Sequence, residues 1–315
     1  MYFLSRSDQQ QEISSFKEEI LRRAAVGDTT SYLYIVPTSA AARKLIDAIT
    51  IASAGRAIEL PAIVSLDEFI GRLARAIRPS TRVLSPAESA VFIELALKDL
   101  LRQNALHYFE GDPNPGPKLP IQRGTFQRIV ASIASLKESG ISPEKLIEDI
   151  SRAQSDPERL IADNSSLRRS GDLAAIYRSY QVRLGSEFTD RTGQYGIVTS
   201  YFELPSSVIT ELQLLKINRI FRQIFPKVTD IFIGSFIKIP VPAREILFAL
   251  SRLEEVNLVF ELDYSPKNDS LFALVRKFIA QATQDGFSLY SGNDQDSTAH
   301  NSSKFLRENL FHPSG

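Results

Sequence analysis

Residues 32–49 read YLYIVPTSAAARKLIDAI, a stretch with the pattern of a strand that leads directly into a helix. An apolar run through Val36 ends at Pro37, and the hydroxyl residues Thr38 and Ser39 then precede an Ala-rich segment with helical periodicity. The stretch predicts a strand that turns into a helix whose first backbone N–H groups have no partner within the helix. These N–H groups could face the phosphate of a nucleotide, the phosphate of a nucleic acid, or water.

The same alternation extends beyond this stretch. Short apolar, β-branched or aromatic runs typical of strands occupy residues 2–4, 33–36, 62–64, 231–233 and 256–262. Helical periodicity follows the first four of them, over residues 12–25, 40–49, 67–77 and 243–253. Continuous apolar strands that alternate with helices indicate an α/β fold with a buried parallel sheet and helices on both faces. Ligands of such sheets bind beyond the carboxyl ends of the strands.

A long helical block separates the third and fourth strands. Residues 79–226 contain no clear strand, and several helix starts are visible, such as the capping box formed by Ser85 and Glu88 with Pro86 at the first helical position. We therefore expect an all-helical domain, residues 79–226, inserted into an α/β domain made of residues 1–78 and 227–290. The polar residues after Tyr290 predict a flexible linker and the start of a truncated downstream region over 291–315.

Composition narrows the possible functions. Lys+Arg and Asp+Glu both number 37, so a nucleic-acid surface would have to be a local patch on a neutral protein. The chain has no cysteine, which excludes disulfides, thiolate nucleophiles and cysteine-held metal centres, and its three histidines lie far apart in sequence. We therefore expect no metal site. We also expect no membrane partner and a cytoplasmic location, because neither a membrane-spanning run nor a signal peptide is visible.

The positions where an α/β ATPase holds its nucleotide lack the required residues. The loop after the first strand, residues 5–11, has no glycine and no Lys-Ser or Lys-Thr pair, and Asp8 would repel a phosphate. Gly234 follows the fourth strand, where an Asp would hold Mg²⁺, while Asp230 stands at the other end of that strand. The sequence thus predicts a degenerate nucleotide pocket formed by Ser5, Arg6, Ser7, Asp8, Gln9, Gln10 and Gly234.

Several segments in consecutive order resemble the UvrD-like superfamily 1 helicases. VPTSAAARKL resembles motif Ia, IVSLDEF resembles motif Ib, and IGSF with the helix after it resembles the Walker B region. KESGISPE, and DLAAIYRSY together with FTD, resemble segments of the inserted 1B domain. These segments occupy residues 36–45, 63–69, 233–236 with 240–250, 137–144, and 172–180 with 188–190. The pattern is most similar to that of AddB/RexB-type subunits of bacterial ATP-dependent helicase–nucleases.

The resemblance implies a RecA-like 1A domain with the helical 1B domain inserted, as the N-terminal part of a double-strand-break repair protein. It implies single-stranded or broken double-stranded DNA as a ligand and an active superfamily 1 helicase–nuclease subunit as a partner. ATP with Mg²⁺ and an iron–sulfur cluster would belong elsewhere in the full complex. This chain departs from the family pattern at the degenerate nucleotide motifs, so we expect no cofactor and no catalytic residue in it.

The resemblance gives the candidate DNA-binding residues as Thr38, Ser39, Arg43, Lys44, Ser65, Arg72 and Arg75. Each has a simpler alternative, because hydroxyl residues cap helices generally and charged runs are usually solvated faces. Motif Ib here contains Leu66, Asp67 and Glu68, which lack an aromatic ring for stacking and place carboxylates near a phosphate backbone. Three hypotheses therefore stay open: a module that guides single-stranded DNA and docks a motor subunit, a scaffold that touches no nucleic acid, or an ATPase that uses an unrecognised loop.

Overall fold

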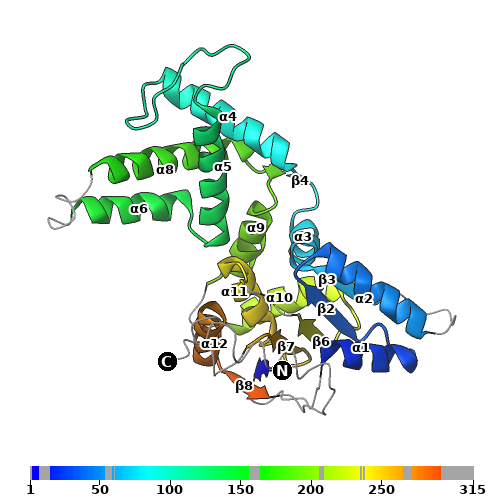
Figure 1. Ribbon diagram of the computed structural model, residues 1–315. Helices are drawn as coiled ribbons and strands as arrows, with labels where there is room; N and C mark the ends of the chain where they lie inside the picture. The colour runs from blue at the N-terminus through cyan, green and yellow to red at the C-terminus, as the bar shows by residue number, and fades with distance from the viewer. Residues whose placement is uncertain are drawn as a thin grey trace, which may run out of the picture. The chain divides into compact units, whose positions relative to one another are not determined.

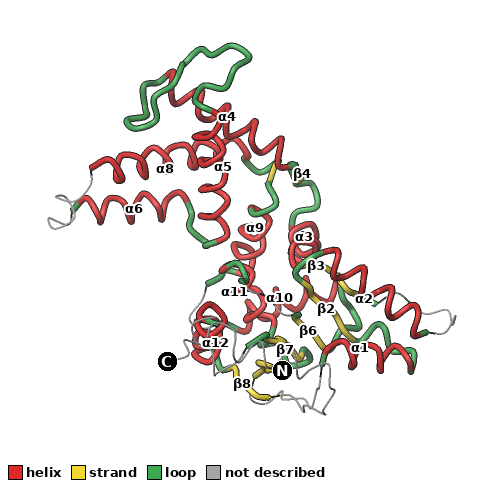
Figure 2. Tube along the Cα trace, viewed as in Figure 1, coloured by secondary structure: helices red, strands yellow, loops and turns green. Residues whose placement is uncertain are grey.

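The computed structural model describes residues 2–6, 15–53, 59, 61–155, 164–205, 209–234, 236, 238–264 and 272–291. Over these residues the protein is mixed α/β, with eleven helices and a mostly parallel central sheet (Figures 1 and 2). The chain divides into two compact units. The sheet unit comprises Met1–Ala76, Phe202–Ile239 and Ala243–Gly315, and the helical unit comprises Ile77–Tyr201 with Pro240–Pro242.

The described part of the sheet unit contains a six-stranded sheet in the order β3-β2-β6-β7-β1-β8. Its strands are β1 (Tyr2–Arg6), β2 (Tyr32–Val36), β3 (Ala62–Ser65), β6 (Asp230–Ile233), β7 (Asn257–Leu262) and β8 (Phe287–Ser291). Strands β3, β2, β6 and β7 pair in parallel, whereas β1 is antiparallel to both of its neighbours. The predicted parallel sheet is thus wrong at β1, because an apolar run shows that a strand is buried but not in which direction it runs.

Helices cover both faces of this sheet. Helices α1 (Phe16–Ala25) and α2 (Ser39–Ala52) pack on the face that carries Phe232 and Val259, and the rings of Phe16 and Phe232 lie 4.9 Å apart. Neighbouring residues of a strand alternate between faces, so Phe260 points to the opposite face. There its ring lies 5.1 Å from Phe278 of α12 (Ala273–Gln284) and 6.2 Å from Phe248 of α11 (Val241–Leu250). Each buried Phe contributes about 1.5–3 kcal/mol to the stability of the fold.

Two further helices complete the sheet unit. Helix α3 (Leu66–Ile77) follows β3 directly, and α10 (Glu211–Ile224) precedes β6. The ring of Phe225, just after α10, lies 5.9 Å from Phe69 of α3 and 5.5 Å from Phe221 of α10. Because these aromatic contacts bind α10 to the sheet unit, the structure groups α10 there, whereas the predicted boundary at residue 226 assigned it to the helical insertion.

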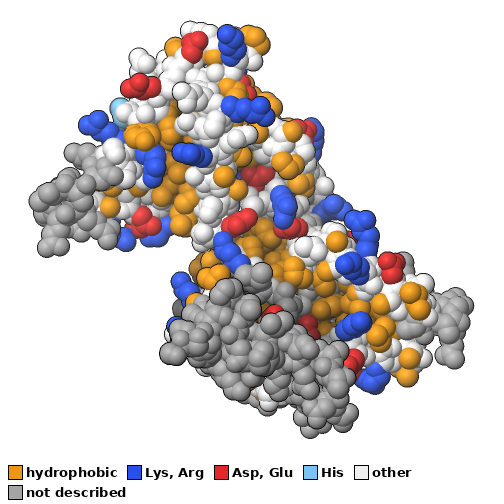
Figure 3. All heavy atoms as spheres, in the orientation of Figure 1, with side chains coloured by type: hydrophobic (Ala, Val, Ile, Leu, Met, Phe, Trp, Pro, Cys, Tyr) orange, Lys and Arg blue, Asp and Glu red, His pale blue; other side chains and the backbone are white. Residues whose placement is uncertain are grey.

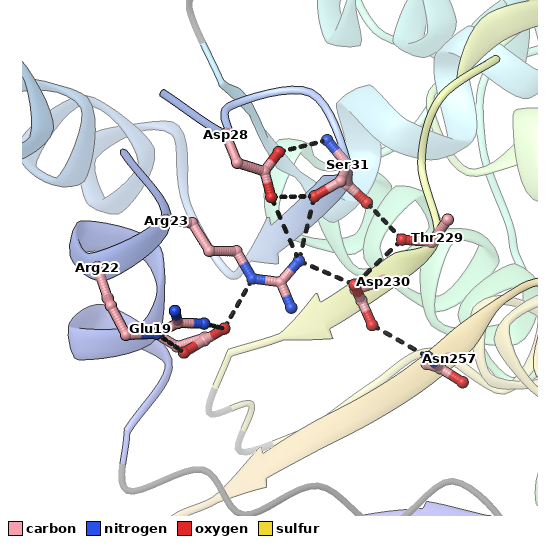
Figure 4. A network of polar contacts seen from close by, with 8 residues as sticks. All are labelled: Glu19, Arg22, Arg23, Asp28, Ser31, Thr229, Asp230 and Asn257. Carbon is pink, nitrogen blue, oxygen red and sulfur yellow. Dashed lines mark hydrogen bonds and ion pairs between the residues drawn. The ribbon is translucent and has the colours of Figure 1, made fainter. Parts of the chain in front are cut away.

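Figure 4 shows a polar network at the amino edge of the parallel strands. The guanidinium of Arg23, near the end of α1, donates to Asp230 Oδ2 over 2.8 Å and to Glu19 Oε1 over 2.7 Å. Asn257 Nδ2 of β7 donates to the other oxygen of Asp230 over 3.2 Å. Asp230 is the first residue of β6 and is buried, so its carboxylate ties α1, β6 and β7 together at the edge opposite Gly234.

The helical unit contains α4 (Pro86–Arg102), α5 (Arg123–Glu138), α6 (Pro143–Gln154), α8 (Asn164–Leu184) and nearly all of α9 (Gly193–Phe202). The predicted capping box of Ser85 and Glu88 is confirmed at the start of α4. The expectation of an all-helical insertion is wrong in one detail, because β4 (Arg82–Val83) and β5 (Phe188–Thr189) pair as a short parallel sheet. Strands of two residues carry no periodic signal, so the sequence pattern could not reveal them.

The predicted linker, residues 291–315, lies outside the described residues except at its first position. Ser291 ends β8, where it pairs with Tyr2 of β1. Strand β8 and helix α12 were not predicted from the sequence, although both belong to the sheet unit. The sheet therefore continues one residue beyond the predicted end of the α/β domain.

Candidate nucleic-acid interface

Three parallel strands end side by side at the carboxyl edge of the sheet. Val36 of β2 lies opposite Ser65 of β3, and Ile35 lies opposite Ile233 of β6. The backbone N–H of Gly234, just after β6, donates to the carbonyl oxygen of Ile35 over 2.8 Å. The strand register thus brings the residues that follow β2, β3 and β6 to one edge, which is where parallel α/β sheets bind ligands.

The junction between β2 and α2 leaves the start of the helix exposed. Thr38 is the N-cap of α2, and its Oγ1 accepts a hydrogen bond from the N–H of Ala41 over 3.2 Å. Ser39 is the first residue of α2, and Ser39, Arg43 and Lys44 are all exposed. The first turn of α2 contains no acidic residue, so the positive end of its dipole is not neutralised by its own side chains.

The junction between β3 and α3 is already satisfied by protein groups. Ser65 is buried, and its Oγ accepts from the N–H of Glu68 over 3.3 Å. Asp67 and Glu68 occupy the first turn of α3, where carboxylates favour the helix dipole. Arg72 Nη2 lies 2.7 Å from Glu68 Oε1 and its guanidinium lies 6.0 Å from the ring centroid of Phe225, whereas Arg75 is exposed in the last turn. Ser65 and Arg72 therefore already make contacts that stabilise α3.

A carboxylate of the protein itself faces the start of α1. Ser15 caps this helix through the N–H of Glu18, and Glu261 Oε1 of β7 accepts from the N–H of Phe16 over 3.4 Å. Burial raises the pKa of Glu261 above the ordinary value of a glutamate, although the hydrogen bond from Phe16 acts in the opposite direction. In nucleotide-binding α/β proteins the helix after the first strand points its N-terminus at a phosphate. In this protein that helix end points at Glu261.

The side chain of Tyr34 limits the space at Gly234, where the ATPase pattern would have a metal-holding Asp. A Cβ atom added at Gly234 would lie 3.0 Å from Tyr34 Oη and 3.4 Å from the nearest ring carbons of Tyr34. Tyr34 is buried in the core under α1 and α2, so its ring cannot easily move aside. A carboxylate at position 234 would therefore meet the tyrosine before it could reach a metal ion.

The structure does not bring together all residues of the predicted nucleotide pocket. Because β1 is antiparallel, Arg6 lies at the amino edge of the sheet, opposite Phe287, while Gly234 lies at the carboxyl edge. Ser5 is fully buried in β1, and Arg6 Nη1 donates to the carbonyl oxygen of Asp285 over 3.3 Å. The remaining predicted residues, Ser7, Asp8, Gln9 and Gln10, lie outside the described residues. Sequence reasoning missed Glu261, although a lone Glu inside the apolar run VNLVFEL is a visible signal.

Lys and Arg side chains lie on the surface in the region of α2 and α3 (Figure 3). No group of three or more His, Asp or Glu side chains that could hold a metal occurs among the described residues. None of the helices that the structure describes is long and apolar enough to cross a bilayer.

Comparisons with protein-family models and with curated proteins find no match for this chain.

Proposed function

We propose that this chain is a non-catalytic helicase-like module of a DNA double-strand-break repair helicase–nuclease. In this proposal the sheet unit is a RecA-like 1A domain, the helical unit is its inserted 1B domain, and an active superfamily 1 motor subunit is the partner. The proposal rests on the ordered sequence resemblance to AddB/RexB-type subunits of UvrD-like fold. The mostly parallel sheet, with helices on both faces, is compatible with it.

One observation carries the DNA-binding part of the proposal. The start of α2 offers backbone N–H groups, the exposed Ser39 and two exposed cations, Arg43 and Lys44, with no acidic residue in its first turn. Hydroxyls, backbone N–H groups and cations are the groups that contact nucleic-acid phosphates. Single-stranded DNA would lie over the carboxyl ends of the strands, with its phosphates at α2 and at Arg75 of α3.

The same edge of the sheet supports a role without ATP hydrolysis. Glu261 accepts a hydrogen bond at the N-terminus of α1, where a nucleotide phosphate would be expected, and Tyr34 lies against Gly234, where a metal-holding carboxylate would need room. Isothermal titration with ATP and Mg²⁺ should give no binding heat at millimolar nucleotide. A measured affinity in the micromolar range would show that another loop of the chain forms a nucleotide site.

Equilibrium binding of fluorescein-labelled single-stranded DNA tests the proposal. Anisotropy should rise with protein concentration at low salt, and the logarithm of the binding constant should fall linearly with the logarithm of the salt concentration. For single strands the slope is about −0.7 per phosphate neutralised, so a few contacts predict a slope of about −2 to −3. The DNA-guiding role fails if no change in anisotropy occurs at micromolar protein and low salt.

The alternative function, a scaffold without nucleic-acid contact, has its own support in the sheet unit. Leu212 and Leu215 of α10 are 63% and 65% exposed, as expected for a surface that another protein covers. Replacement of Thr38, Ser39 and Arg43 by Ala separates the two functions. The DNA-guiding role predicts weaker DNA binding and lower activity of the assembled complex, whereas the scaffold role predicts that both stay unchanged.

A further inference from the structure

The helical unit contains a groove that the proposed function does not use. Its volume is about 500 Å³. Gly171, Ala175 and Ser179 of α8 line it together with Ile147 of α6 and Leu100 of α4. Figure 1 shows α6 and α8 lying alongside each other. We call this feature the α6–α8 groove.

The apolar side chains around the groove are incompletely covered. Val182, which also lines the groove, is 75% exposed. Helix α6 has a clear apolar face formed by Leu146, Ile147, Ile150 and Ala153, yet each of these residues is only half-buried. A surface helix normally buries such a face against the rest of the protein. The groove therefore exposes apolar surface of the kind that a second helix covers.

Small residues make the groove accessible to a helix backbone. Gly171, Ala175 and Ser179 are spaced by four residues, so they form one ridge along α8. A Cβ atom added at Gly171 would meet no atom within 4 Å, which shows that the space above it is open. Helix axes approach most closely where the facing side chains are small. The stretch from Gly171 to Val182 is about 17 Å long, which matches a helix of three turns.

The charges of α8 favour one kind of partner. Arg168 and Arg178 are exposed on the same side of the helix as Gly171 and Val182. The single acidic residue of α8, Asp172, is buried and accepts hydrogen bonds from the backbone N–H groups of residues 107–109. Arg183, also on the groove lining, forms an ion pair with Asp99 of α4. The described groove side of α8 thus presents cations without a carboxylate of its own.

Of the five charged residues of α6, Glu144 lines a separate pocket and not the groove. The other four form pairs: Lys145 with Asp149 over 2.8 Å, and Arg152 with Glu148 over 2.7 Å. These four residues neutralise one another along the exposed side of α6, away from Ile147. The positive charge of Arg168 and Arg178 therefore stays available to a ligand.

We propose that the α6–α8 groove binds an acidic amphipathic helix of a partner protein. The apolar residues of that helix, at positions i, i+3 or i+4, and i+7 of its own sequence, enter the groove. Its Asp or Glu side chains pair with Arg168 and Arg178. The apolar lining and the small-residue ridge favour a protein helix over a nucleic acid, because a phosphate backbone needs a track of cations, and of the two that line the groove, Arg178 and Arg183, the second is paired with Asp99. This inference concerns the helical unit and does not depend on whether the sheet unit binds DNA.

The test uses a fluorescein-labelled synthetic peptide of fourteen residues with Leu at i, i+3, i+7 and i+10 and Glu and Ala elsewhere. Anisotropy titrations with the full chain should show saturable binding. A matched peptide with Lys in place of Glu should bind at least tenfold more weakly, because it meets Arg168 and Arg178 with like charge. A peptide with Ser in place of Leu should not bind, because it has no apolar face to bury.

Substitutions in the groove sharpen the test. Gly171→Leu should abolish binding of the Glu peptide without unfolding the protein, because the new side chain enters open space and Leu favours a helix more than Gly. Arg178→Glu should weaken binding at least tenfold. Arg128→Glu, an exposed position on α5, is the matched control and should leave the affinity unchanged. Circular dichroism confirms that each variant is folded.

Four outcomes would overturn the proposal. The first is that the Glu peptide does not bind at 100 μM, and the second is that it binds wild type and Gly171→Leu equally well. The third is that light scattering shows a dimer of this chain that Gly171→Leu dissociates, which would make a second copy the occupant. The fourth is that single-stranded DNA displaces the peptide and binds the Arg178→Glu variant more weakly, which would make the groove a nucleic-acid site.

Discussion

At the scale of single residues, the close approach of Tyr34 to Gly234 limits the side chain that position 234 can accept. The Tyr34 hydroxyl lies where the Cβ of any larger residue at position 234 would need room. Gly234→Ala should therefore lower the free energy of unfolding by about 1–3 kcal/mol, the usual cost of overpacking a core. Urea unfolding followed by circular dichroism measures this value.

The pair can be tested by removing the hydroxyl. Tyr34→Phe retains the ring and removes Oη, which is the atom nearest to the added Cβ. Gly234→Ala should then cost clearly less in the Tyr34→Phe background than in the wild type. Equal costs in the two backgrounds would show that Tyr34 does not occupy this space.

Glu261 provides a second residue-scale prediction, which concerns pH. Burial raises the pKa of Glu261 in the folded protein, so the folded state binds this proton more tightly than the unfolded state does. The stability that this residue contributes is present below the ordinary glutamate pKa and is lost as the pH rises through the raised pKa. Glu261→Gln should remove this loss, so the variant should gain stability relative to wild type between pH 4 and pH 8.

Urea unfolding at pH 4.5, 6 and 8 checks the Glu261 prediction. The difference in unfolding free energy between Glu261→Gln and wild type should grow in favour of the variant as the pH rises. Glu18→Gln, an exposed position on α1, is the control and should show a much weaker trend. A difference that grows in favour of wild type would contradict a raised pKa of Glu261 in the folded protein.

At the scale of elements, one buried ion pair joins three helices of the helical unit. Lys137 of α5 is 7% exposed, and its Nζ lies 2.5 Å from Asp190 Oδ2. The same carboxylate accepts from Tyr180 Oη of α8 and from the N–H of Gly193 at the start of α9, both over 2.5 Å. Burial alone would raise the pKa of Asp190, but Lys137 and these hydrogen bonds outweigh burial and hold it below its ordinary value.

Removal of the negative charge of this ion pair should strongly destabilise the fold. Asp190→Asn retains the shape of the side chain but leaves Lys137 buried without a counter-charge, which should cost about 3–5 kcal/mol of unfolding free energy. Lys137→Met combined with Asp190→Asn should recover much of this loss. Asp149→Asn, at the exposed pair with Lys145 on α6, should change stability little. If Asp190→Asn costs no more than Asp149→Asn, the pair does not hold the helices together.

Helix caps could be predicted from the sequence alone, whereas contacts between distant segments could not. Helix starts such as Ser85 with Glu88 were predictable, because capping residues act within three positions along the chain. The direction of β1 was not predictable, because it depends on pairing with β7 about 250 residues later. Thr38 was recognised correctly as one of two possible caps, and the structure shows that it is the cap. The role of Glu261 depends on the N–H of Phe16, a contact that no local pattern encodes.

At the scale of the whole molecule, the two units present different candidate binding surfaces. The sheet unit holds the edge at which α2 presents Ser39, Arg43 and Lys44, and the helical unit holds the α6–α8 groove. The first binds DNA in the proposed function, and the second binds a protein helix in the further inference. Because the two tasks lie on different units, variants of one surface should leave the other activity intact.

The affinity of labelled single-stranded DNA for the Arg43→Glu/Lys44→Glu variant shows whether DNA binds at the start of α2. Both side chains are exposed, so the variant should fold normally and lose at least tenfold in affinity at low salt. Arg276→Glu/Lys277→Glu reverses two neighbouring exposed cations on α12, so it changes the net charge equally and should retain nearly the wild-type affinity. Equal affinity of wild type and both variants, or equal loss in both variants, would contradict DNA binding at the start of α2.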